Sequence, residues 1–167
     1  MTSNSIFTFK SIERQYQKAI DVGYEVIRCE DYYFRKNDLP EKTLVNRVDI
    51  DCSLRNTERL VDIFNRLEIK ASFFLRLHAP NYNPFSFENY RIIKKIIDSG
   101  HELGYHSEVI DQSAIWGEDA ESCLLRDIEV INKMFNIKIK GVASHGKGTD
   151  DADEIYWLYF FGQAVSE

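Results

Sequence analysis

Residues 47–51 read R-V-D-I-D, and this stretch decides how the rest of the chain is interpreted. Branched apolar residues alternate with polar ones, which is typical of a β-strand with one apolar and one polar face. Because side chains alternate along a strand with a period of two, Asp49 and Asp51 are expected on the same face. Two carboxylates placed in this way are suited to binding a metal ion and to taking up a proton.

A second polar stretch, G-H-E-L-G-Y-H-S-E, occupies residues 100–108. It holds two histidines and two acids within nine residues, with glycines between them. Divalent-metal hydrolases use this set of groups, since oxygen and nitrogen ligands hold the ion and a further carboxylate takes a proton from its bound water. The two stretches together predict a hydrolase that depends on a divalent metal.

Apolar residues recur at helical or strand spacing along most of the chain. A polar segment with Pro40 predicts a loop at 31–43. The alternation of strands and helices predicts an α/β fold, in which right-handed crossovers join parallel strands. Helices are predicted at 10–22, 57–67, 87–99, 118–135 and 153–161, and strands at 24–28, 44–51, 71–77, 102–107 and 139–144.

The polar residues with catalytic chemistry fall at the carboxyl ends of the predicted strands. In parallel α/β folds these ends meet at one edge, and active sites are built there. We therefore expect one site that combines residues from several strands. Its candidates are Asp49, Asp51, Arg76, His78, His106, Glu108 and His145.

The composition is that of a single globular domain. The 167 residues suffice for one core, and 44% of them are hydrophobic. The formal net charge is −6, with acids and bases interspersed, so no basic face is offered to nucleic acid. The N-terminus lacks a signal-peptide pattern and no apolar run reaches the length of a membrane span, so a cytoplasmic protein is expected.

The three cysteines are scattered and form no C-x-x-C pair. Neither a disulfide framework nor a zinc ribbon is therefore expected. Cys52 follows the acidic pair, and a nucleophilic role is one interpretation. We expect it to be a small buried packing residue instead, because no motif places a base beside it.

The two polar stretches, with I-K-A-S-F-F at 69–74 between them, resemble the polysaccharide deacetylase family. These are the NodB-homology proteins, or family-4 carbohydrate esterases. The form R-x-D-x-D resembles the branch to which the aminoarabinose-lipid deformylases belong. The resemblance covers residues 44–146, so only the N-terminal part of the family's domain is expected in this chain.

The resemblance implies a distorted (β/α) barrel, usually of seven strands, with helices outside. We therefore expect a partial barrel in a single domain over 1–167. Its segments are 1–43 (helix, short strand and loop), 44–146 (the motifs) and 147–167 (an acidic turn and an aromatic helix). The resemblance also implies hydrolysis of N-acyl groups, mostly N-acetyl on amino sugars, with a divalent metal that is often zinc.

Position by position, the resemblance gives Asp49 the place of the catalytic base and Asp51 that of a metal ligand. His106 matches the first histidine of the family motif H-[ST]-x-x-H. The second histidine falls at Ile110, whose side chain offers no ligand atom. The third ligand is therefore expected to be His145, with Glu108 as the alternative.

Other polar residues receive supporting roles. Arg76, His78 and Ser144 are expected to contact the substrate. His101, in the G-H-E part of the second stretch, matches a family position that holds no metal. We expect it to be a structural residue that bonds backbone groups.

Two functions remain open from the sequence. The first is a metal-dependent hydrolase that removes an N-acyl group from an amino sugar or glycan precursor. The second is a catalytically impaired or truncated relative that binds a glycan or a partner protein. A partial barrel leaves two sheet edges open, and the aromatic residues Trp157, Phe160 and Phe161 add an apolar surface, so a homo-oligomer is predicted.

Overall fold

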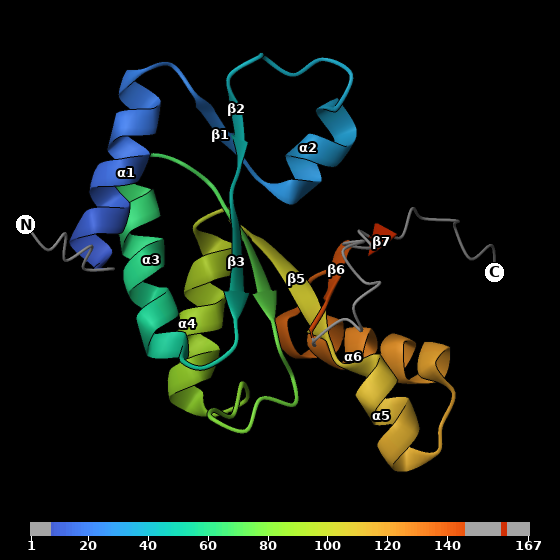
Figure 1. Cartoon of the computed structure of the whole chain (residues 1–167). Coiled ribbons are helices and arrows are strands. Elements are labelled where there is room, and N and C mark those ends of the chain that lie inside the picture. Colours follow the sequence, from blue (N-terminus) through green and yellow to red (C-terminus); the bar gives the residue numbers. More distant parts are fainter. Residues whose placement is uncertain (1–7, 146–157, 160–167) are drawn as a thin grey trace, which may run out of the picture.

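A five-stranded sheet forms the centre of the computed structural model, which describes residues 8–145 and 158–159 (Figure 1). The first four strands of the sheet are parallel, and the last is antiparallel to its neighbour. The predicted parallel α/β fold is thus confirmed, and the described strands form an open sheet as expected for a partial barrel. In order across the sheet, the strands are β3 (Arg47–Ile50), β4 (Ser72–Leu75), β5 (Glu102–Ser107), β6 (Gly141–Ser144) and β7 (Leu158–Tyr159).

Helices follow the parallel strands and cover the sheet from outside (Figure 1). α1 packs against α3, and α3 packs against α4. Side chains of Ser53, Ser86 and Asp119 cap three helices by accepting a backbone N–H, which explains where these helices begin. The helices are α1 (Phe9–Asp21), α3 (Leu54–Arg66), α4 (Phe87–Asp98) and α6 (Ala120–Phe135).

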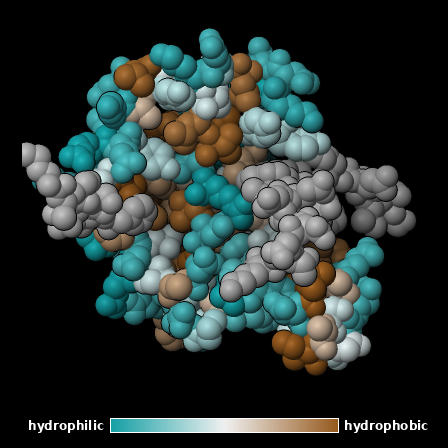
Figure 2. Space-filling model, viewed as in Figure 1, coloured by the Kyte–Doolittle hydropathy of each residue, from teal (hydrophilic) through white to brown (hydrophobic). Residues whose placement is uncertain are grey.

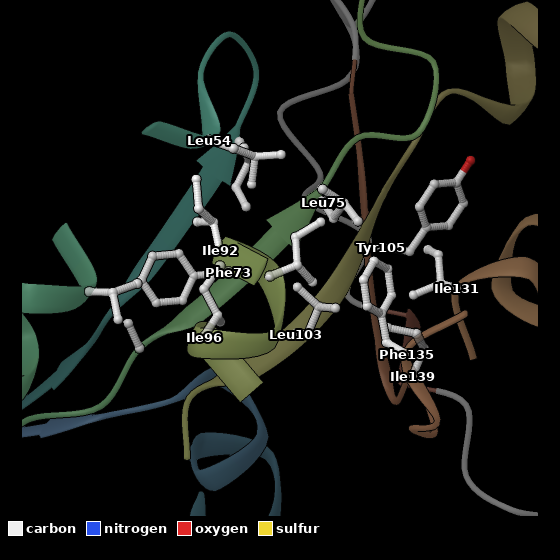
Figure 3. Close-up of a cluster of buried hydrophobic side chains, with 14 of the residues drawn as sticks. Leu54, Phe73, Leu75, Ile92, Ile96, Leu103, Tyr105, Ile131, Phe135 and Ile139 are labelled. Carbon is white, nitrogen blue, oxygen red and sulfur yellow. The ribbon is translucent and has the colours of Figure 1, made fainter. Parts of the chain in front are cut away.

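The core lies between the sheet and these helices (Figure 3). Every residue of β4 and β5 is buried, as expected for central strands of a parallel sheet. Burial of these apolar side chains is the main stabilising contribution to the fold. The cluster includes Phe73, Leu75, Leu103 and Tyr105 from the sheet, and Ile92, Ile96, Ile131 and Phe135 from the helices.

The predicted strand at 44–51 is divided at Asn46, which is 1% exposed. Before this residue, β2 (Thr43–Val45) pairs with β1 (Glu25–Ile27) in a separate two-stranded parallel sheet. The Asn46 N–H donates to Ile27, and its carbonyl accepts from Ser72 at the start of β4. The strand therefore changes partners at Asn46, which no local pattern reveals.

The predicted loop at 31–43 is wrong for its first part, because α2 (Cys29–Arg35) extends into it. The guanidinium of Arg28 forms two hydrogen bonds with Asp31, at 2.7 and 2.9 Å, across the first turn of the helix. The backbone N–H of Cys29 donates to Ser72 Oγ at 2.7 Å. The local Arg28–Asp31 pair and this contact with β4 together fix the start of the helix, and neither appears as apolar periodicity in the sequence.

Two further elements differ from the expectation. Helix α5 (Val109–Trp116) was not predicted, and its apolar residues Ile110 and Ile115 are 72% and 76% exposed. Within the predicted helix 153–161, residues 158–159 form β7, because they pair with the edge of β6. The rest of that segment, with Trp157, Phe160 and Phe161, lies outside the described residues, so the homo-oligomer stays a prediction.

Among the described residues, no helix is both long and apolar enough to cross a membrane.

Candidate metal centre

Three side chains from three strand ends meet at the carboxyl edge of the sheet. Asp51 follows β3, His106 lies near the end of β5, and His145 follows β6. Each offers one ligand atom, and these atoms all lie within 4.8 Å of one another. Ligand atoms that each lie about 2 Å from one ion are at most about 4 Å apart. Small side-chain adjustments therefore bring the group to the geometry of a metal site.

His106 is fixed by both burial and hydrogen bonding. It is 4% exposed, and its Nδ1 lies 3.0 Å from the carbonyl oxygen of Ala143 on β6. A carbonyl only accepts, so Nδ1 carries the proton and Nε2 keeps its lone pair. Nε2 lies 3.4 Å from Asp51 Oδ1. The tautomer required of a metal ligand is thus set by the backbone of the neighbouring strand.

His145 reaches the same point from β6. Its backbone N–H donates to the carbonyl of Ser107 at 2.7 Å, which holds the residue against the end of β5. Its Nε2 lies 3.8 Å from Asp51 Oδ1. The rings of His106 and His145 are perpendicular, with centroids 5.0 Å apart. Two imidazole nitrogens therefore approach a single carboxylate oxygen.

The shared carboxylate oxygen gives an independent indication that a cation fits. Asp51 Oδ1 is a buried atom without a hydrogen-bond partner in the described structure. Leaving a buried carboxylate oxygen unpaired is costly, whereas a bound cation satisfies it. Zinc commonly takes imidazole and carboxylate ligands in this combination. The residues present therefore fit a divalent ion.

Asp49, on β3, lies beside this group and, like Asp51, faces His106. Its Oδ2 is 3.8 Å from His106 Nε2. The guanidinium of Arg47 bonds both carboxylate oxygens, at 2.7 and 2.9 Å. Since a bidentate Arg pair fixes the plane of a carboxylate, Asp49 is oriented next to the metal group and is not one of its three members.

Glu108 and Arg76 form a pair behind His145. Arg76 donates to Glu108 Oε1 at 2.5 Å, and the same oxygen lies 3.6 Å from His145 Nδ1. Burial disfavours the charged form of Glu108, but the hydrogen bond and charge of Arg76 more than offset this and hold its pKa below the ordinary value. The structure thus brings Arg76, predicted as a substrate contact, to Glu108 at the back of the site.

His78 is turned toward the helices. Its Nε2 lies 3.1 Å from the carboxylate of Asp127 on α6, which also accepts from Tyr105 and Gln112. Asp127 is 4% exposed, so this network is largely buried. No sequence signal pointed to this network, because Asp127 lies on a predicted helix far from any motif. Ser144 is exposed at the end of β6, next to His145.

Of two residues expected to have only structural roles, His101 is buried as predicted and Cys52 is not. His101 is 5% exposed and accepts the backbone N–H of Ala71 at 3.2 Å, as expected of a structural residue. Burial, with smaller contributions from Lys70 and Arg28, lowers its pKa to about 4. Cys52 was expected to be buried, and this is wrong. It is exposed, because it lies in the turn between β3 and α3.

A cavity of about 330 Å³ adjoins the group on the side of α1 and α3. Asp49 and Asp51 line it together with apolar residues that include Phe9 and Leu60. Figure 2, in the same view as Figure 1, shows hydrophilic residues over the middle of the molecule with hydrophobic residues above and beside them. The candidate centre therefore borders a space with both polar and apolar walls.

This open parallel sheet, with an Asp-His-His group at its carboxyl edge, is similar in fold to two solved structures. Among solved structures, IcaB from Ammonifex degensii has a similar fold, with a TM-score of 0.62 and 18% identity over 89% of this chain and 71% of that one. The Streptococcus pyogenes deacetylase PplD, solved in complex with acetate, has a TM-score of 0.57 and 16% identity over 85% and 67% of the chains. No protein-family model matches the chain, and no curated protein does. The resemblance to deacetylases is thus confirmed at the level of the fold.

Proposed function

We propose that this chain is a metal-dependent hydrolase that removes an N-acyl group, such as acetyl, from an amino sugar or glycan precursor. The observation that carries the proposal is the meeting of Asp51, His106 and His145 at one edge of a deacetylase-like fold. Asp49 lies beside them and is held by Arg47. A base next to a metal group is what amide hydrolysis needs.

In this proposal Asp51, His106 and His145 hold a divalent ion, with zinc as the first choice for this ligand set. When bound, the ion supplies Lewis acidity toward the acyl carbonyl and lowers the pKa of a bound water. Asp49 takes a proton from the attacking water and passes it to the leaving amine nitrogen, so that free amine and carboxylic acid result. Arg47 keeps the Asp49 carboxylate oriented for this step through its two hydrogen bonds.

The cavity beside Asp49 and Asp51 supports a substrate larger than the acyl group alone. Its volume of about 330 Å³ lies at the lower end of the range of small-molecule sites. Polar walls at Asn56 and Ser53 suit sugar hydroxyls, and apolar walls at Phe9 and Leu60 suit the faces of a sugar ring.

The test combines metal analysis with activity on the whole chain. We expect close to one zinc per chain after reconstitution, and release of acetate from N-acetylglucosamine oligomers or of formate from N-formyl amino sugars. Asp51→Asn and His106→Ala are expected to lose both metal and activity. Asp49→Asn is expected to keep the metal and to lose at least about 100-fold in turnover, since general base catalysis contributes at least that much.

The controls separate the outcomes. Glu118→Gln removes a carboxylate paired with Arg126 on α6, and it should leave both metal content and turnover unchanged. Wild-type protein without bound metal would overturn the proposal. Bound metal without release from any of these substrates would favour the impaired relative instead.

A further inference from the structure

The two ring nitrogens of His145 face two different carboxylates, those of Asp51 and Glu108. Its Nε2 lies 3.8 Å from Asp51 Oδ1, whereas its Nδ1 lies 3.6 Å from Glu108 Oε1. His145 Nδ1 and Glu108 Oε2 are both buried atoms without a hydrogen-bond partner in the described structure. His145 Nδ1 therefore faces a buried carboxylate just beyond hydrogen-bond distance. The oxygen at 3.6 Å, Oε1, also accepts from Arg76, whereas Oε2 is the unpaired oxygen of the same group. A small rotation of the imidazole ring brings Nδ1 within hydrogen-bond distance of this carboxylate.

Glu108 itself has little freedom to move. Its side chain is 9% exposed, and Arg76, 17% exposed, donates to it at 2.5 Å. The backbone of His145 is tied to Ser107, the residue before Glu108, by a 2.7 Å hydrogen bond. The end of β5 thus holds the main chain of His145, and the residue that follows it, Glu108, faces the ring.

We propose that Glu108, anchored by Arg76, is a positioning residue that makes His145 the third metal ligand by accepting its Nδ1–H. The inference rests on the proposed metal-dependent function. An imidazole that donates from one nitrogen presents the lone pair of the other to the metal. This arrangement supplies from β6 the ligand that the motif position Ile110 does not supply from α5.

The same arrangement argues against Glu108 as the third ligand itself. The ligand atoms that gather at this edge belong to Asp51, His106 and His145, whereas the Glu108 carboxylate is engaged by Arg76 behind the ring. The two roles make different predictions for variants. Removing a ligand abolishes metal binding, whereas removing a carboxylate that only orients a ligand weakens metal binding without abolishing it.

The first experiment measures zinc affinity by competition with a chromogenic chelator. His145→Ala should abolish binding as fully as Asp51→Asn. Glu108→Ala should weaken binding about 10–100-fold, the range typical of partners that orient a ligand. Glu108→Gln should be affected less, because its amide oxygen still accepts from Nδ1. Glu118→Ala, which removes the carboxylate of another 2.5 Å Arg–Glu pair, should bind as wild type does.

Wild-type affinity in Glu108→Ala would overturn the inference and leave the proposed function standing. Retained binding in His145→Ala with total loss in Glu108→Ala would also overturn it, since Glu108 would then be the ligand.

A second experiment uses the metal-free protein, so it separates this inference from the proposed function. Nitrogen-15 NMR of the histidine rings should show His145 protonated at Nδ1 in wild type. The proton should move toward Nε2 in Glu108→Ala, and Glu108→Gln should restore the wild-type form. Protonation of wild-type His145 at Nε2 would overturn the inference, whether or not the chain binds zinc.

Discussion

His106 donates from Nδ1 to the carbonyl oxygen of Ala143 at 3.0 Å. This bond orients the His106 ring, so the backbone of the sheet determines which ring nitrogen faces the candidate centre. The two residues are register partners on β5 and β6. Because the strands are locked in this register, Nε2 of His106 can only face the Asp51 side. A shift of β6 by one residue would remove the acceptor and move His145 away as well.

The position of Ile110 allows a test of where the third ligand comes from. Ile110 lies in the first turn of α5 and is 72% exposed. We expect Ile110→His to leave zinc affinity unchanged, because in our proposal His145 fills the third position. Tighter binding by this variant in the chelator competition would show that the backbone at α5 follows the family's course and that His145 leaves the position open.

Acid should destabilise the fold through His101. Its pKa is about 4 in the folded chain, below the ordinary value near 6.5 in the unfolded chain. Between these values the unfolded chain binds a proton that the folded chain does not, so stability is complete above about pH 6.5 and is lost as the pH falls toward 4. The loss attributable to this group is about 2.5 kcal/mol by pH 4.5.

Urea unfolding at pH 7.5 and pH 4.5 checks this expectation, with His101→Asn as the comparison. The Asn amide oxygen can accept the Ala71 N–H, and the side chain does not titrate. The free energy of unfolding should fall further in wild type than in the variant. Equal falls in the two proteins would show that other groups carry the acid sensitivity.

Gly104 is required by packing rather than by backbone conformation. A Cβ at this position would lie 2.5 Å from a ring carbon of Phe74 and 3.0 Å from the carbonyl oxygen of Gly141. We expect Gly104→Ala to lower the free energy of unfolding by about 1–3 kcal/mol, as overpacking of a core does. Thermal unfolding of the variant, alone and combined with Phe74→Leu, measures the effect.

The double variant should recover part of the loss, because a smaller side chain at 74 frees the space that the new methyl group needs. Strictly additive effects of the two changes would contradict the proposed clash. Gly117 offers a control for space, since nothing lies within 4 Å of a Cβ built there, although its φ of +65° also disfavours other residues.

The predicted homo-oligomer remains testable in solution. In the described part of the chain β3 lies at one edge of the sheet, and an unpaired strand edge can accept a second chain. Light scattering during gel filtration should give the mass of a dimer, and the double change Trp157→Asp, Phe160→Asp should reduce it to a monomer. A stable wild-type monomer at micromolar concentration would disprove the prediction.

The sequence by itself determined the α/β class, the bounds of β5 and the shared face of Asp49 and Asp51. These features depend on local periodicity, because a period of two places side chains 49 and 51 on the same side of an extended chain. Helix α3 begins at Leu54, three residues before its predicted start at 57, because the side chain of Ser53 caps it. Motif resemblance then singled out His106 as a ligand.

Only the tertiary structure decided which side chains meet. The partner change at Asn46, the turn of His78 toward Asp127 and the Arg76–Glu108 pair behind His145 all join residues distant in sequence. Such pairs depend on strand register and on helix packing, and neither can be predicted from the spacing of residues along the chain. The sequence thus set what each segment can form, and packing set which polar groups share one site.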